Sequence, residues 1–202
     1  ICEGSTHTLV GVIGGSASTL LWDNGGGDGS FDDATAAGAI YTPGGTDISS
    51  GSVTLTITTD DPDVGGPCTA TASSIILTIN PIATVSAGIN ATICEGSTHT
   101  LVGVIGGGAS TLLWDNGGGG GSFNDATLAG AIYTPGGTDI STGSVTLTIT
   151  TDDPDGIGPC AAAVSAMVLT INSVATASAG INATICEGST HTLVGVIGGS
   201  AS

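Results

Sequence analysis

The chain has 202 residues, a formal net charge of −17 and no lysine or arginine. Nucleic-acid affinity comes mainly from basic side chains that neutralise phosphates, so nucleic acid is excluded as a partner. Electrostatic attraction to an anionic membrane is excluded for the same reason. Apolar residues make up 40% of the chain and alternate in strand-like runs, which indicates a folded protein. No apolar run approaches the ~20 residues of a membrane helix, so we expect no membrane insertion in this segment.

One segment of the chain occurs three times and sets its organisation. The segment begins at Ile1, Ile93 and Ile185, and both steps are 92 residues long. Residues 1–92 and 93–184 differ at 16 positions, so 76 of 92 are identical. This period is close to the ~100 residues of a β-sandwich domain. We therefore expect each repeat to fold as a domain, and the chain to be part of a longer array.

Short strands separated by turns follow one another along the repeat. Residues 6–13 alternate, with Val10 and Val12 on an outward face that is a candidate contact between modules. Further strands are predicted at 19–23, 39–42 and 53–58, and a last strand places Ile75, Leu77 and Ile79 toward the core. The sequence has no helical period of useful length. About seven strands per period, with turns every 8–12 residues, predict an all-β fold of tandem antiparallel β-sandwich modules.

The boundaries of the modules depend on the segment that precedes the second Cys-Glu-Gly. Residues 82–92 are predicted to form the first strand of the second module. On this basis residues 1–80 are a repeat without its first strand, 82–172 a complete repeat and 174–202 the beginning of a third. An unpaired sheet edge invites association. We expect either a continuous array, or completion of residues 1–80 by the tail of another copy.

The cysteines fall at two positions of the repeat. Cys2, Cys94 and Cys186 share one position, and Cys68 and Cys160 share the other. The separation of 66 residues in each module predicts one disulfide per module, Cys2–Cys68 and Cys94–Cys160, and leaves Cys186 without a partner. The alternative is two reduced, buried thiols in each module. Structural disulfides persist in oxidising compartments, so the pattern indicates an extracellular, secreted protein.

A set of motifs occurs in the same order in each full repeat: Ile-Cys-Glu-Gly-Ser-Thr, Ile-Tyr-Thr-Pro, Gly-Ser-Val-Thr-Leu-Thr-Ile-Thr-Thr-Asp-Asp-Pro, Gly-Pro-Cys and Leu-Thr-Ile-Asn. Together they resemble the immunoglobulin-like repeats of very large bacterial cell-surface proteins associated with gliding motility and type IX secretion. The resemblance implies an Ig-like sandwich, export, and a role as a stalk, fibre or adhesin. It implies no catalytic residue.

Two kinds of side chain are candidates for a binding site. The acidic turns place three carboxylates within four residues, and flexible oxygen ligands suit Ca²⁺. The alternative is a solvated turn shaped by Pro62 and Pro154. The histidines His7, His99 and His191 occur once per repeat, and we interpret them as half-buried core residues rather than ligands. The candidate calcium ligands are Asp60, Asp61, Asp63, Asp152, Asp153 and Asp155.

No cofactor other than Ca²⁺ is expected, and no enzymatic activity. The sequence has no Walker loop, no G-x-S-x-G and no C-x-x-C, and it has no basic residue to stabilise an anionic transition state. The preferred hypothesis is a structural module of an extracellular fibre or cell-surface stalk, whose partners are copies of itself. Two alternatives stay open, an adhesin that binds glycan or protein receptors and a surface array stiffened by calcium.

Overall fold

The computed structural model describes residues 1–199, and this part of the chain divides into two compact units. The first comprises residues 1–84 with 106–110 and 152–163. The second comprises residues 85–105 and 111–151, with the described residues from Val164 onward. No helix among the described residues is long and apolar enough to cross a membrane.

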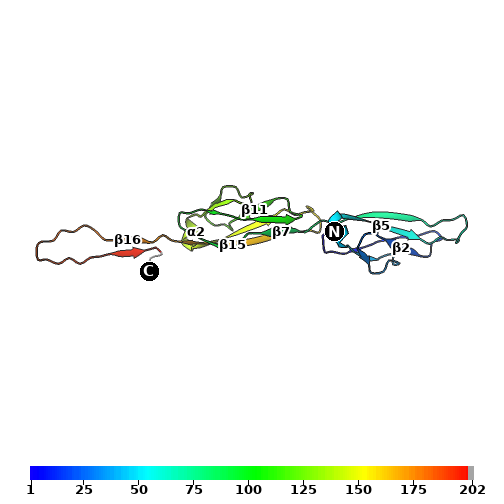
Figure 1. Ribbon diagram of the computed structural model, residues 1–202, viewed down its shortest axis with the longest axis horizontal. Coiled ribbons are helices and arrows are strands. Elements are labelled where there is room, and N and C mark those ends of the chain that lie inside the picture. Colours follow the sequence, from blue (N-terminus) through cyan, green and yellow to red (C-terminus); the bar gives the residue numbers. More distant parts are fainter. Residues whose placement is uncertain (200–202) are drawn as a thin grey trace. The chain divides into compact units, whose positions relative to one another are not determined.

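The second repeat is a complete sandwich, in which a four-stranded sheet faces two smaller sheets (Figure 1). One sheet has the order β11-β14-β15-β8, from Leu112–Asp115, Ser144–Thr151, Val164–Asn172 and Ala91–Cys94. Its strands are antiparallel except for β8, which runs parallel to β15. The facing strands have the orders β12-β13-β9 and β10-β7, from Ser122–Phe123, Ile132–Thr134, His99–Thr100, Val104–Gly107 and Ala83–Ser86. In chain order these strands have the arrangement of an immunoglobulin fold, with β7 in the place of its first strand.

The first repeat has six of the nine strands of the second repeat, in the same register. One sheet has the order β2-β5-β6, from Leu20–Asp23, Ser52–Thr59 and Ala72–Thr78. The other has the order β1-β4-β3, from His7–Thr8, Ile40–Thr42 and Ser30–Phe31. Among residues 1–80 no strand corresponds to β7 or β10, and only the single parallel bridge between Cys2 and Asn80 corresponds to β8. After the second repeat, β16 (Thr176–Ser178) pairs with β17 (Val196–Gly198).

Each sandwich encloses its own core. The side chains of Tyr41, Leu55 and Ile79 are at most 1% exposed in the first repeat, as are their counterparts Tyr133 and Leu147 in the second. The alternation of Val53, Leu55 and Ile57 with threonines explains this packing, because successive residues of a strand point to opposite faces. Burial of each large apolar side chain contributes roughly 1.5–3 kcal/mol.

A short helix precedes the longest strand of each repeat. Helices α1 (Gly45–Ser50) and α2 (Gly137–Thr142) are each followed by a glycine with positive φ, Gly51 and Gly143, whose amide bonds back to the helix. Asp47 is only 4% exposed and accepts hydrogen bonds from the Tyr41 hydroxyl and the Gly44 amide. The helix start is therefore tied to the core through a tyrosine.

The predicted fold of tandem antiparallel sandwich modules is confirmed. The predicted strands at 19–23, 39–42 and 53–58 are present, and each bound lies within one residue of the expected one. The prediction of one strand over 6–13 is wrong, because only His7–Thr8 is a strand. The two helices were not expected, since six residues are too few to show a helical period. Leu77 and Ile79 are buried as predicted, but Ile75 is 44% exposed.

Candidate functional site

The disulfide of the structure joins cysteines of different repeats. Cys2 is bonded to Cys160, with their Cα atoms 5.4 Å apart and a sequence separation of 158. Both residues are buried, and both belong to the first compact unit, which includes the loop 152–163. Cys68, Cys94 and Cys186 are free and exposed.

The predicted pairs Cys2–Cys68 and Cys94–Cys160 are therefore wrong. Cys2 lies beside Asn80, just after the end of β6, whereas Cys68 lies in the loop before β6 begins at Ala72. The extended stretch from Ala72 to Asn80 spans roughly 26 Å, at ~3.3 Å per residue. A disulfide needs Cα atoms within about 7 Å. The two cysteines of the first repeat thus lie at opposite ends of their sandwich.

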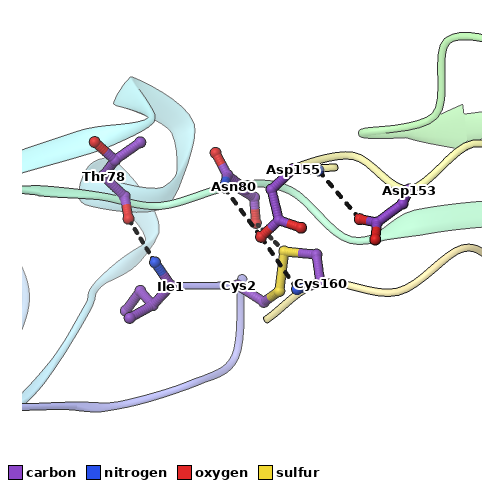
Figure 2. The surroundings of a disulfide bond; sticks show 7 residues. All are labelled: Ile1, Cys2, Thr78, Asn80, Asp153, Asp155 and Cys160. Carbon is purple, nitrogen blue, oxygen red and sulfur yellow. Dashed lines mark hydrogen bonds between the residues drawn. A yellow bond between two sulfur atoms is a disulfide. The ribbon is translucent and has the colours of Figure 1, made fainter. Parts of the chain in front are cut away.

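Figure 2 shows how the bonded cysteines are held. Asp155 accepts hydrogen bonds from the Cys160 amide at 3.1 Å and from the Asn80 side-chain amide at 3.4 Å. The terminal amine of Ile1 donates to the Thr78 carbonyl at 2.9 Å, which fixes the chain that carries Cys2. The sulfur atoms and the Asp155 carboxylate lie within 4.8 Å of one another. Because the sulfurs are bonded to each other, they offer no thiolate to a metal.

The acidic turns use their carboxylates to hold backbone amides. Asp60 accepts from the Ser18 amide at 2.9 Å, the Ser18 hydroxyl at 2.6 Å and the Thr19 amide at 3.0 Å. The Ser18 hydroxyl and these amides lower the pKa of Asp60 to about 2. Asp63 accepts from the Cys68 amide, whose hydrogen bond lowers the pKa of Asp63.

The corresponding carboxylates of the second repeat have similar partners. Asp152 accepts from the Ser110 amide and hydroxyl, and Asp153 accepts from the Asp155 amide at 3.2 Å. In the part of the chain that is described, the three carboxylates of a turn do not form a cluster that could hold a metal ion. Calcium binding by Asp60, Asp61, Asp63, Asp152, Asp153 and Asp155 stays a prediction.

The histidines lie in the sheet opposite the long strands. His7 and His99 are half-buried and stand opposite Tyr41 and Tyr133 in the strand register, which agrees with the interpretation as core residues. His191 is exposed.

A groove runs along one side of the first repeat. Its volume is about 360 Å³, and its walls include Val12, Ile13, Ile57, Cys68, Ala72 and Ser73. Val12 is 84% exposed there. Ile75 and Ile76, which follow on β6, are 44% and 73% exposed. An open strand edge beside apolar side chains is the arrangement that accepts an added β-strand.

The second repeat shows what fills the corresponding place. There β7 pairs with β10, the buried side chain of Ala87 lies in the core cluster, and β8 pairs with β15. Met167 and Val168, the counterparts of Ile75 and Ile76, are only 2% and 38% exposed. Residues 82–92 thus cover in the second repeat the surface that is open in the first.

Sequence reasoning expected a missing first strand but did not locate the groove or the disulfide between repeats. Residues 82–92, which the sequence assigns to the second repeat, were a signal for the groove, whereas the cysteine positions alone did not specify the disulfide pairing.

Comparisons with known proteins leave the family open. No family model and no curated protein matches this chain. Among solved structures it is similar to mouse cadherin-23 EC22-24, with a TM-score of 0.40 and 16% identity over 85% of this chain and 62% of that one. It is also similar to mouse clustered PcdhgC3 EC1-3, with a TM-score of 0.42 and 15% identity over 85% of this chain and 64% of that one. The chain thus spans less than two thirds of either structure, and scores this low do not establish a shared fold.

Proposed function

We propose that the chain is a structural, non-catalytic module of an extracellular fibre or cell-surface stalk, built from sandwiches in series. The observation that carries the proposal is the Cys2–Cys160 bond, which ties the start of one repeat to a late loop of the next. Such a bond persists in an oxidising compartment, which supports a location outside the cytoplasm. The motifs that resemble repeats of very large bacterial cell-surface proteins agree with this role.

The bond changes the path that tension takes through the chain. A force applied to both ends enters near Ile1, crosses from Cys2 to Cys160 and leaves through the residues that follow. The 157 residues between the two cysteines carry no load while the bond is intact, since 160 − 2 − 1 = 157. A sandwich that lies within the bonded loop cannot be fully extended by pulling. This arrangement is suited to a module that must resist stretching.

The surface chemistry also agrees with a structural role. Seventeen acidic residues and no lysine or arginine give every module the same sign of charge, which favours solubility. The acidic side chains are used for local hydrogen bonds, as at Asp60 and Asp155, rather than gathered around a pocket.

Single-molecule pulling from the two ends tests the proposal. The bond should hide 157 residues, or roughly 530 Å at ~3.4 Å per residue, from the extension of the oxidised chain. Reduction, or the variant Cys2→Ser, should release that length, while Cys186→Ser should behave like the parent chain. Equal extension of the oxidised and reduced chains would show that the bond bears no load, and would overturn the proposal.

A further inference from the structure

We propose that Cys2 and Cys160, once their bond is reduced, form a binding site for one zinc ion together with Asp155. The inference goes beyond the proposed structural function, which concerns the oxidised chain. It rests on two observations. Three possible ligand atoms lie close together, and a buried oxygen atom of Asp155 has no hydrogen-bond partner among the described residues.

The three side chains already lie near the separation that a zinc ion requires. The sulfur atoms of Cys2 and Cys160 and a carboxylate oxygen of Asp155 are within 4.8 Å of one another, and all three residues belong to the first compact unit. Tetrahedral zinc binds thiolate at about 2.3 Å and carboxylate at about 2.0–2.2 Å, so two zinc-bound sulfurs are roughly 3.8 Å apart. A disulfide holds its sulfurs about 2 Å apart. Reduction therefore has to let the sulfurs separate by only about 2 Å.

Asp155 has an unused oxygen beside the two sulfurs. Its Oδ2 atom accepts the hydrogen bonds from the Cys160 amide and the Asn80 side chain (Figure 2). Its Oδ1 atom is buried and has no hydrogen-bond partner in the described part of the chain. A buried carboxylate oxygen without a partner is costly, because it has lost its water and gained nothing in return. A cation bound between this carboxylate and the sulfurs would supply the missing partner.

The loop does not leave an oxygen unpaired wherever it occurs. In the first repeat the carboxylate of Asp63 occupies the equivalent position. Its Oδ2 atom accepts from the Cys68 amide at 3.1 Å, and its Oδ1 atom accepts from the Gly66 amide at 3.2 Å. The unpaired oxygen of Asp155 is thus a feature of its own surroundings, which contain the two sulfurs, and not of the loop sequence.

The ligand types favour zinc over calcium. Thiolate is a soft ligand that zinc accepts readily, whereas Ca²⁺ takes roughly six to eight oxygen ligands. Three protein ligands leave the fourth position of a tetrahedral zinc ion to water. Cys2 and Cys160 are buried, and the chain has no lysine or arginine to offset two thiolates and a carboxylate. A divalent cation is therefore the group that can compensate these charges.

The site forms from the disulfide in two steps. A phosphine reductant gives two electrons to the S–S bond and takes the oxygen of one water molecule. It becomes a phosphine oxide, and the two protons of the water go to the sulfurs. Zinc then replaces the two thiol protons, which pass to the solvent. Glutathione disulfide reverses the second state: it takes two electrons from the thiolates and two protons from the solvent, the S–S bond forms and zinc is released.

The first experiment uses a full chain in which Cys2 and Cys160 are the only cysteines, the two-cysteine chain. It carries Cys68→Ser, Cys94→Ser and Cys186→Ser, is reduced without oxygen, is freed of the phosphine and is titrated with Co²⁺ as a coloured substitute for zinc. We expect one ion per chain, with the visible bands of a tetrahedral site and the near-ultraviolet band of a thiolate bound to cobalt. Zinc should remove these bands, and excess Ca²⁺ should leave them unchanged.

Variants of the two-cysteine chain test the ligands. Asp155→Asn keeps an oxygen for the Cys160 amide but should weaken Co²⁺ binding at least ~10-fold, since even the residues that only support a ligand affect metal affinity roughly 10–100-fold. The matched control Asp63→Asn should leave the affinity unchanged. A reduced two-cysteine chain without the thiolate band, or an Asp155→Asn chain that binds Co²⁺ as tightly as the two-cysteine chain, overturns the inference.

The second experiment maps the site in the parent chain. The reduced chain is treated with iodoacetamide in one equivalent of zinc or in chelator, and is then cleaved with a non-tryptic protease. Zinc should slow the alkylation of Cys2 and Cys160 and leave that of the exposed Cys68, Cys94 and Cys186 unchanged. Equal alkylation rates of Cys2 and Cys160 with and without zinc would refute the site. The pulling curve of the oxidised chain does not depend on zinc, so it tests the proposed structural function separately.

Discussion

At the scale of single residues, the acidic side chains act as hydrogen-bond acceptors for nearby loops. Asp60 joins the turn after β5 to Ser18 and Thr19, just before β2. Its folded pKa of about 2 lies below the ordinary value of 3.8. The contribution of the carboxylate to stability is therefore fully present above the ordinary pKa and is lost as the pH falls toward 2.

The variant Asp60→Asn tests this contribution. The melting temperature of the variant should lie below that of the parent chain at neutral pH, and the difference should shrink between about pH 4 and pH 2. Thermal unfolding followed by circular dichroism across this pH range measures it. Asp61→Asn, which removes the same charge from the same turn, is the control. A difference between Asp60→Asn and the parent chain that is as large at pH 2 as at pH 6 would contradict the assignment.

The buried tyrosines provide a test at alkaline pH. Burial, together with the hydrogen bond to Asp47, raises the pKa of Tyr41 to about 12, and burial with the bond to Asp139 does the same for Tyr133. A raised pKa favours the neutral phenol in the folded state, so this stability is complete below pH 10 and is lost as the pH rises through 12. Absorbance titration should show no tyrosinate near pH 10 while the chain is folded. Tyr41→Phe and Tyr133→Phe should each lower the free energy of unfolding by ~1–3 kcal/mol.

At the scale of strands, one sequence has two structures in this molecule. Val104–Gly107 forms β10 beside β7, whereas the same four residues at 12–15 form no strand. The alternation along residues 6–13 predicted one continuous strand. The later part of this segment forms a strand only in the second repeat, as β10, where β7 is its partner. The strands with partners in both repeats, such as β5 and β14, follow from the Val-Thr-Leu-Thr-Ile pattern alone. Local sequence specifies which residues can form a strand, and the neighbouring chain decides whether they do.

Hydrogen exchange should report this difference at one pair of amides. The Val168 amide is bonded to the Asn90 side chain, whereas Ile76 has the open edge of β6 beside it. At low protein concentration, the Ile76 amide should exchange faster than the Val168 amide. The amides of the next residues, Leu77 and Leu169, point toward the neighbouring strands β5 and β14 and should be equally protected from exchange. Equal slow exchange at Ile76 and Val168 would show that the first repeat has no open edge.

At the scale of the whole molecule, the repeat allowed the tandem sandwiches to be predicted but left the disulfide pairing undetermined. The 92-residue period predicted tandem sandwiches from sequence alone, and the cysteine positions predicted that disulfides form. The pairing could not be predicted, because the two cysteine positions recur in every repeat. A cysteine can pair with a cysteine of its own repeat or of another repeat, and the separations of these candidate pairs differ by a multiple of 92 residues. A bond over 66 residues and one over 158, which is 66 + 92, satisfy the same pattern. Only the position of Cys2 at the end of β6, far from Cys68, distinguishes them.

Because the net charge of the chain is −17, cations in the solution should affect its stability. Any salt should raise the melting temperature by screening the repulsion among carboxylates. If the acidic turns bind Ca²⁺, CaCl₂ should raise it further than NaCl at equal ionic strength. A native-state ligand at a hundred times its dissociation constant adds ~2.7 kcal/mol.

The double variant Asp61→Asn, Asp153→Asn should abolish the calcium-specific increment. These two carboxylates each accept a single long hydrogen bond from the amide two residues on, so they have oxygen atoms to offer an ion. The control Glu3→Gln, Glu187→Gln removes the same charge elsewhere and should retain the increment. Calorimetry of the three chains in CaCl₂, in NaCl and in chelator separates a bound ion from a diffuse ion cloud. Identical melting of the parent chain in all three solutions at matched ionic strength would rule out the calcium-stiffened array and leave the disulfides and strand contacts to hold it together.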